Sequence, residues 1–179
     1  MQQGAPSLIA VAFAGALLVA CNHSKLSSDF VVVRSDREIT GNSKFPVAVD
    51  PNRVGTYPPD TKSGAGYFYD DVLEYRVWLH PEKGAEHLNG THDYFVAFAQ
   101  YEPAEAFSTR TPGAEPPLVL VRQLEWLDEP ERGHFIPEKG ERITEWQVVW
   151  LADSKRTDRS IDEFLKHPKE AGPETELSQ

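Results

Sequence analysis

The chain has 179 residues, a net charge of −10 and a single cysteine. This acidic balance disfavours binding to nucleic acid and electrostatic adhesion to anionic lipid. One cysteine excludes an internal disulfide and the length suits one ordinary domain, so its stability must come from a hydrophobic core.

The first feature along the chain is an apolar run, LIAVAFAGALLVAC, from Leu8 to Cys21. It is shorter than the roughly 20 residues that a membrane-spanning helix needs, and it lacks the period of an amphipathic helix. The hydrophobic region of a signal peptide fits it better, although no Lys or Arg precedes it. An uncleaved anchor and a free structural cysteine are the alternatives.

The end of this run, LVAC at residues 18–21, resembles the lipobox of bacterial lipoproteins. The resemblance implies that residues 1–20 are a signal peptide and that the Cys21 thiol carries a diacylglyceryl group, which makes the lipid bilayer a partner. It also implies a place in the bacterial cell envelope. Asn22 after the cysteine indicates the outer membrane, with the domain facing the periplasm.

Composition divides the remaining chain into three parts. Residues 21–66 are rich in Ser, Asp, Pro and Gly, which predicts a tether with one candidate edge strand at Phe30–Val33. Residues 67–167 form the expected folded domain, and residues 168–179 are expected to be a disordered acidic tail. The stretch DTKSGAG does not match a phosphate-binding loop, because Asp60 and Thr61 stand where the pattern counted from Gly55 needs glycine and lysine, and any cofactor stays unknown.

The first half of the domain contains two strands and a helix. Apolar and polar residues alternate from residue 73 to residue 79, which predicts a half-buried strand that stops at Pro81. The run Tyr94–Ala99 is apolar on both faces and is therefore expected at the centre of the sheet. A helix should follow, with Pro103 in its first turn and Gly113 at its end.

The second half begins with a strand over residues 116–126. A hairpin is then predicted over HFIPEKGERITEWQVVWL, with its turn at Pro137–Gly140 and its second strand reaching Leu151. SIDEFLKH is expected to form a short helix, in which Ser160 and Glu163 have the spacing of a capping box. Together these elements predict an α+β fold with a small, mainly antiparallel sheet of about five strands and one or two short helices.

Three stretches, TKSGAGYFYDDVLEYRVWLHP, FAQYEPAEAFSTRTPGAEPPLVLVRQ and ERITEWQVVWL, resemble a family of short bacterial proteins often labelled GNAT-type N-acetyltransferases. The resemblance covers about residues 55–167 and implies acetyl transfer from coenzyme A. Acetyltransferases of that superfamily hold the pyrophosphate on backbone N–H groups where a helix begins. The only counterpart here, RTPGAE, is expected to follow a helix; within it Pro112 lacks an N–H and Glu115 would repel phosphate.

A second enzymatic interpretation concerns Arg76 and His80, which share the polar face of the first strand, and Glu145 in ITEW. Their arrangement resembles that of ADP-ribosyltransferases, which implies that Arg76 or His80 would grip a dinucleotide and that Glu145 would orient the attacking group. The alternative is a cross-strand ion pair, in which Arg76 pairs with Glu74 or Glu145 on a solvated sheet face.

His80, His87 and His92 invite comparison with a zinc site. Two of them are expected in a loop and no thiol accompanies them, so the sequence assigns no metal. The function favoured by the sequence is a lipid-anchored envelope protein with a binding or structural module of unknown ligand. A small transferase of either kind is the alternative, and whether the protein is an enzyme is left open.

Overall fold

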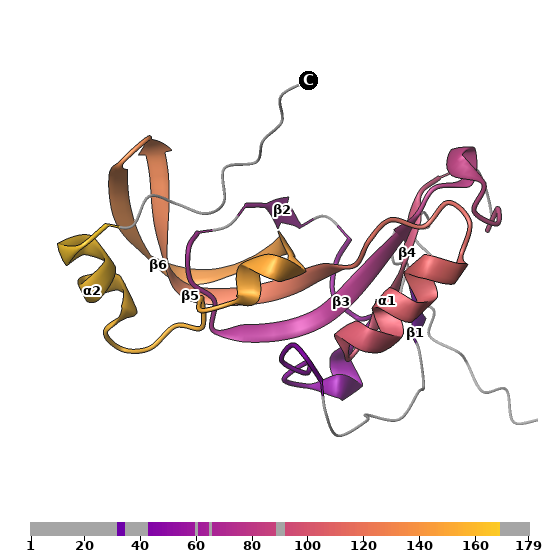
Figure 1. The fold of residues 1–179 in the computed structure, drawn as a ribbon, viewed down its shortest axis with the longest axis horizontal. Helices are drawn as coiled ribbons and strands as arrows, with labels where there is room; N and C mark the ends of the chain where they lie inside the picture. Colours follow the sequence, from indigo (N-terminus) through magenta and orange to yellow (C-terminus); the bar gives the residue numbers. More distant parts are fainter. Residues whose placement is uncertain (1–31, 35–42, 60, 65, 89–91, 169–179) are drawn as a thin grey trace, which may run out of the picture.

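The computed structural model describes residues 32–34, 43–59, 61–64, 66–88 and 92–168. Six strands, two α-helices and three short 3-10 helices make up this part of the chain (Figure 1). In chain order they are β1 (Val32–Arg34), η1 (Pro51–Arg53), β2 (Lys62–Ser63), β3 (Asp71–Leu79), η2 (Pro81–Lys83), β4 (Tyr94–Phe98), α1 (Tyr101–Arg110), β5 (Leu118–Glu131), β6 (His134–Gln147), η3 (Val148–Leu151) and α2 (Ser160–Lys166).

The strands form one sheet in the order β1-β4-β3-β5-β6-β2. Its four longer strands, β4, β3, β5 and β6, are antiparallel, whereas β1 and β2 pair in parallel at the two edges. The predicted α+β class with a mainly antiparallel sheet and two short helices is therefore confirmed. The run near residue 32 is an edge strand, and β4 lies inside the sheet as expected.

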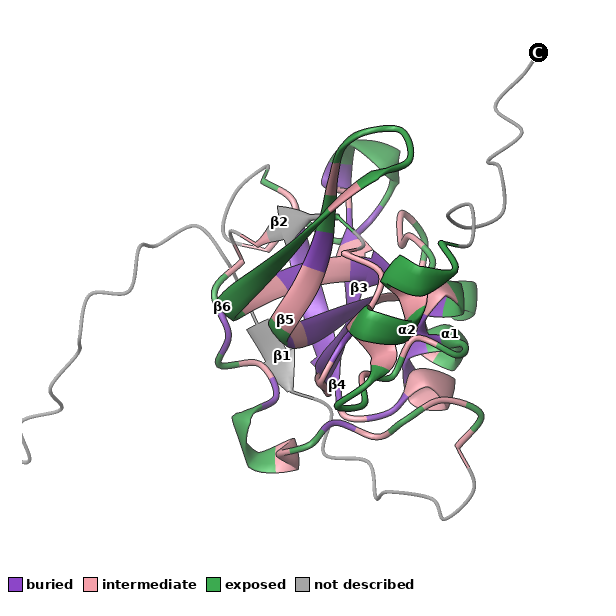
Figure 2. Cartoon of the chain, turned by 90° about the vertical axis from the view of Figure 1, so that its left-hand side faces the viewer, coloured by how far each residue is buried: buried purple, intermediate pink, exposed green. Residues whose placement is uncertain are grey.

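The main core lies on the face of the sheet that α1 covers. Apolar side chains from β3, β4 and β5 meet there, among them Val77, Val96 and Val119, and Trp146 of β6 joins them. Figure 2 shows the buried residues concentrated in the central strands, with exposed residues on α2 and at the outer end of the β5–β6 hairpin. Ala104 is fully buried on α1, which the apolar side of that helix predicts.

Residues 43–59, which we call the strap, begin beside α1, where Phe45 packs against the main core, and then cover the opposite face of the sheet. Ala48 and Val54 are buried against Phe95 and Ala97 of β4, and Tyr57 is buried in a separate cluster. Folded structure therefore begins well before Tyr67, the expected start of the domain. The tether prediction is wrong for the strap because its few apolar residues complete a second layer on the sheet.

The strap also changes the environment of β3. Six consecutive residues of this strand, Val72 to Val77, are buried, so neither face at its centre is solvated. Alternation of apolar and polar residues predicted the strand correctly, but the half-burial that it predicted is wrong. It could not predict the second cover, because the strap is distant in sequence from the strands that it meets.

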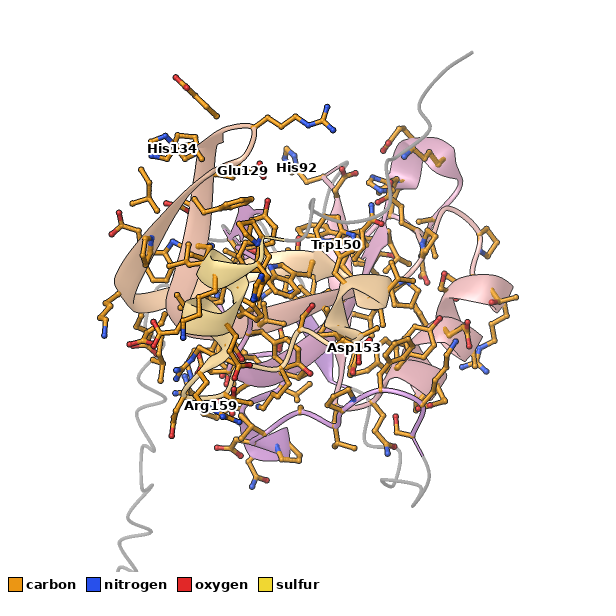
Figure 3. The ribbon with its side chains drawn as sticks, turned by 60° about the vertical axis from the view of Figure 1, so that its left-hand side comes forward. His92, Glu129, His134, Trp150, Asp153 and Arg159 are labelled. Atoms are coloured by element: carbon orange, nitrogen blue, oxygen red, sulfur yellow. The ribbon has the colours of Figure 1, made fainter. Side chains whose placement is uncertain are left out.

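The predicted hairpin turn is displaced. β5 and β6 are 14 residues each and pair from Leu118↔Gln147 out to Glu131↔His134, so the turn lies at Arg132 and Gly133 rather than at Pro137–Gly140. Gly133 has a φ of +79°, a left-handed conformation that glycine adopts in turns without steric cost. Figure 3 shows His134 at the outer end of this hairpin. β6 ends at Gln147, and the residues up to Leu151 form η3 instead of continuing the strand.

Both α-helices are present and begin where expected, but α1 ends at Arg110, three residues before the predicted Gly113, and the cap predicted for α2 is absent. Pro103 lies in the first turn of α1, and Glu102 beside it accepts hydrogen bonds from the strap. In α2, Ser160 is the first helical residue, and its Oγ accepts a hydrogen bond from the backbone N–H of Thr157. The predicted capping box between Ser160 and Glu163 is therefore wrong.

Two predicted segments, the run ending at Cys21 and the tail after residue 168, lie outside the described residues, as do parts of the predicted tether. Among the helices that the structure describes, none has both the length and the apolar character to cross a membrane.

Candidate functional site

The polar side chains of β3 converge on Arg76, which is fully buried at the middle of the strand. Its Nε donates a hydrogen bond to Glu74 Oε1 at 2.7 Å, and its Nη1 donates to Glu145 Oε1 at 3.1 Å. Residues two apart on a strand share a face, so Glu74 and Arg76 lie side by side. Glu145 comes from β6 and also accepts a hydrogen bond from Trp78 Nε1 at 3.3 Å.

The strap closes over this cluster and bonds to both of its charges. Arg76 Nη2 donates to the carbonyl oxygen of Pro58 at 2.9 Å, and the Gly55 N–H donates to Glu74 Oε2 at 2.6 Å. The guanidinium also lies over the ring of Phe95, 4.4 Å from its centroid. Each of the three guanidinium nitrogens is thus hydrogen-bonded inside the protein.

Burial dominates the electrostatics of the pair. Loss of solvent raises the pKa of the Glu74 carboxyl above its ordinary value, and the adjacent Arg76 and the Gly55 N–H oppose this rise. The Glu74 and Arg76 side chains have no exposure, and Glu145 is 13% exposed. Two charges removed from water are tolerated only when they are paired and hydrogen-bonded, and here both conditions hold.

The sequence predicted an ion pair between Arg76 and either Glu74 or Glu145, and the structure contains both. The expected solvated surroundings are wrong, because the strap buries the pair. His80 does not belong to this cluster. It follows Arg76 by four residues along an extended strand, a separation of about 13 Å.

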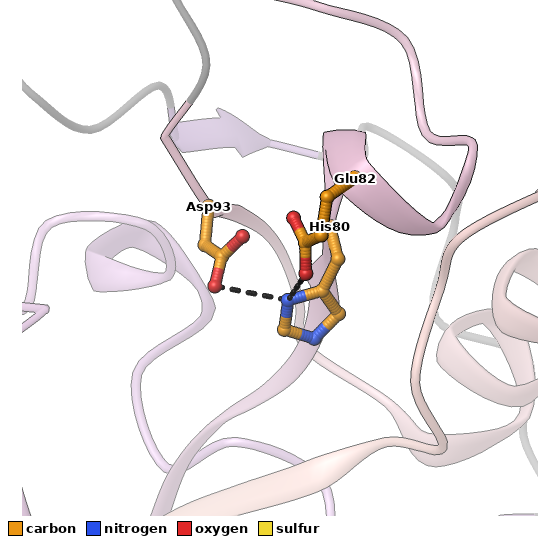
Figure 4. Close-up of side chains that lie close together, drawn as sticks. All are labelled: His80, Glu82 and Asp93. Atoms are coloured by element: carbon orange, nitrogen blue, oxygen red, sulfur yellow. Dashed lines mark ion pairs between the residues drawn. The ribbon is translucent and has the colours of Figure 1, made fainter.

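His80 instead lies in a second polar cluster, at the point where β3 ends and β4 begins. Leu79 pairs with Tyr94, so the next residues outward, His80 and Asp93, face each other across the two strands. His80 Nδ1 lies 2.9 Å from Asp93 Oδ2 and 3.6 Å from Glu82 Oε1 (Figure 4). One ring nitrogen of His80, one carboxylate oxygen of Glu82 and one of Asp93 all lie within 4.8 Å of one another.

The other ring nitrogen of His80 faces inward. Nε2 is buried without a formed hydrogen bond, and Glu115 Oε1 lies 2.8 Å from it. The same carboxylate oxygen accepts a hydrogen bond from Lys83 Nζ at 3.1 Å. The imidazole side chain is 12% exposed and Nε2 is buried, which leaves Nδ1 as the ring nitrogen available to a ligand.

The backbone around His80 is fixed on both sides. Its N–H donates to the carbonyl oxygen of Gly113 at 2.9 Å, and its own carbonyl oxygen accepts from Lys83 and Ala85. Gly113 has a φ of +70°, and a Cβ there would lie 2.3 Å from the Ala85 nitrogen. RTPGAE thus runs from the end of α1 towards β5, as expected, and its glycine provides close backbone packing.

The remaining candidate residues are not brought together. Cys21 lies outside the described residues, and His87 and His92 are not part of the His80 cluster. Sequence reasoning missed Glu82 and Asp93 as neighbours of His80. Antiparallel pairing of the two predicted strands would have indicated Asp93, because the residue after one strand then faces the residue before the next.

Comparison of the chain with family models, with curated proteins and with solved structures finds no match. We therefore infer function from the residues of the two polar clusters and their geometry.

Proposed function

We propose that this chain is a lipid-anchored envelope protein whose α+β domain serves as a binding or structural module. The observation that favours a module over a transferase is the complete internal pairing of Arg76. A side chain that grips a substrate needs donors that can reach it. Arg76 is fully buried and each of its guanidinium nitrogens already has an acceptor.

The same cluster has a clear structural role. Glu74 and Arg76 bond to the strap through Gly55 and Pro58, and Glu145 extends the network to β6. These bonds hold the strap against the sheet and connect strands that are not neighbours. A fixed two-layer domain of this kind suits a module that presents a constant surface.

The transferase alternative has less support. A pyrophosphate site needs several free N–H groups where a helix begins, and RTPGAE follows the last turn of α1. Gly113 is also used in packing against Ala85. An ADP-ribosyltransferase-like site would require Arg76, His80 and Glu145 to converge, whereas His80 belongs to a different cluster.

The lipid anchor is tested by the mass of the mature protein. The full-length chain, expressed in a bacterium and extracted with detergent, should lose residues 1–20 and gain acyl chains on Cys21. The Cys21→Ser variant should keep its leader and carry no lipid. An intact, unacylated wild-type chain would contradict the anchor.

The module is tested by ligand-dependent stability. Acetyl-coenzyme A and NAD⁺ at millimolar concentration should leave the melting temperature unchanged, because a ligand raises it only by binding the native state. A rise with acetyl-coenzyme A that disappears in Gly113→Glu, or a rise with NAD⁺ that disappears in Glu145→Gln, would favour the transferase alternative.

A further inference from the structure

We propose that His80, Glu82 and Asp93 form a binding site for a divalent transition metal ion such as Zn²⁺. The site would use one imidazole nitrogen and two carboxylate oxygens, a donor set that zinc accepts. The sequence assigned no metal, and this inference is independent of the lipid anchor and of the choice between module and transferase.

The three ligands are held by well-defined elements. His80 and Asp93 lie directly beside the paired strand ends Leu79 and Tyr94, and Glu82 belongs to η2, which follows at once. Backbone hydrogen bonds to Gly113, Lys83 and Ala85 fix the position of His80. Sites built on paired strand ends keep their geometry better than sites built on loops.

The distances suit a bound ion. Zinc bonds of about 2.0–2.2 Å at tetrahedral angles place neighbouring ligand atoms roughly 3.3–3.5 Å apart. The observed separations from His80 Nδ1, 2.9 Å to Asp93 and 3.6 Å to Glu82, lie on either side of this range. Both carboxylates are substantially exposed and can rotate to adjust. A fourth position would be open to water or to a ligand.

Glu115 supplies an independent observation. Histidines that bind metal through one ring nitrogen usually donate the other N–H to a carboxylate, which fixes the ring and its tautomer. Nε2 is a buried nitrogen without a formed hydrogen bond, and Glu115 Oε1 lies 2.8 Å away. Metal binding at Nδ1 places the ring proton on Nε2, from which Glu115 Oε1 can accept a hydrogen bond.

The competing explanation is a protonated imidazole paired with carboxylates on both sides. The two explanations differ in metal selectivity. Imidazole is a good ligand for Zn²⁺, whereas Ca²⁺ takes oxygen ligands almost exclusively. A simple acidic cluster would bind both ions through carboxylates alone, and a site that uses His80 should prefer zinc.

The test is calorimetric titration of the full-length chain, freed of metal with a chelator, with ZnCl₂ and separately with CaCl₂. Wild type should bind one Zn²⁺ with micromolar affinity and Ca²⁺ at least tenfold more weakly. His80→Ala should abolish zinc binding at the site. Glu115→Gln should weaken it by about 10–100-fold, the usual effect of removing the carboxylate behind a ligand histidine.

Controls keep the result decisive. Glu82 is largely exposed, so Glu82→Gln should preserve the fold while weakening zinc binding, even if His80→Ala unfolds. His134→Ala, at the outer end of the β5–β6 hairpin, should bind zinc like wild type. The proposal is overturned by absence of zinc binding, by equal affinity for Ca²⁺, or by unchanged zinc affinity in Glu82→Gln.

Discussion

Arg76 on β3 and Glu145 on β6 form an ion pair at 3.1 Å although β5 lies between their strands. The register places Glu74 and Glu145 opposite the same residue of β5, Leu120, so both carboxylates lie in one row on one face. Arg76 is one step farther along that face and reaches diagonally across β5. One buried cation thereby connects β3 and β6 with each other and with the strap.

Removing this cation should destabilise the protein strongly. Arg76→Met keeps most of the side-chain volume but leaves Glu74 buried without its partner, and breaking a buried pair in this way costs about 3–5 kcal/mol. Urea unfolding would measure the loss. An exposed ion pair, as the sequence predicts, would contribute only ~0.2 to 1 kcal/mol.

Two further variants test this prediction. Lys139→Met removes an ion pair with Glu125 in which the lysine is 81% exposed, and it should change stability little. Glu145→Gln should cost less than Arg76→Met because Glu145 retains some exposure and the amide oxygen can still accept a hydrogen bond. A loss below 1 kcal/mol for Arg76→Met would contradict the structural role of the cluster.

Gly113 should tolerate no side chain. A Cβ there would meet the Ala85 nitrogen at 2.3 Å and the His80 oxygen at 2.8 Å, and the positive φ adds strain. Gly113→Ala should therefore lose well over 1 kcal/mol in unfolding free energy. Gly133 has a similar φ of +79° with nothing near its Cβ position, so Gly133→Ala measures the strain alone. Equal losses in the two variants would show that the contact at Gly113 is unimportant.

The contact between the strap and α1 should weaken in acid. Burial raises the pKa of the Glu102 carboxyl, but hydrogen bonds from the Lys44 N–H and Ser43 Oγ lower it by more. The pKa of Glu102 in the folded protein is therefore below its ordinary value of 4.5. A lowered pKa in the folded state contributes stability that is present above 4.5 and is lost as the pH falls through the folded pKa. Glu102→Gln should remove this part of the pH dependence. Parallel pH profiles of the two proteins between pH 7 and pH 3, as measured by urea unfolding, would contradict the assignment.

Phe164 should fix α2 to the β5–β6 hairpin. Its ring contacts Phe135 at 4.9 Å and Tyr67 at 5.1 Å between centroids. Phe164→Ala should cost roughly 2 kcal/mol, less than a fully buried phenylalanine because the ring is partly exposed. It should also speed amide hydrogen exchange in α2, whereas Leu165→Ala on the exposed side should not. Unchanged exchange in Phe164→Ala would place the anchor of α2 elsewhere.

The sequence by itself determined the elements whose signals are local. Alternation from residue 73 to residue 79, the apolar run at Tyr94 and the position of Pro103 predicted β3, β4 and the start of α1. These patterns work because side-chain direction within a strand and backbone geometry at proline depend only on neighbouring residues.

The local sequence pattern did not predict how far β5 and β6 pair with each other. Pro137 and Gly140 have the composition of a turn, yet the pairing of β5 with β6 extends to Glu131 and His134 and places the turn at Gly133. Pro137 is tolerated in β6 because that end of the strand has no partner on its outer side in the described chain.

The candidate sites show the same division. Sequence alone identified Arg76, His80 and Glu145 as candidate site residues. It also offered a structural ion pair as the alternative to a catalytic role for Arg76. Only the tertiary structure buried Arg76 beneath the strap and separated His80 into a cluster with Asp93 and Glu82. Burial and clustering depend on contacts between residues far apart in the chain, and no local pattern of residue types specifies which of those contacts will form.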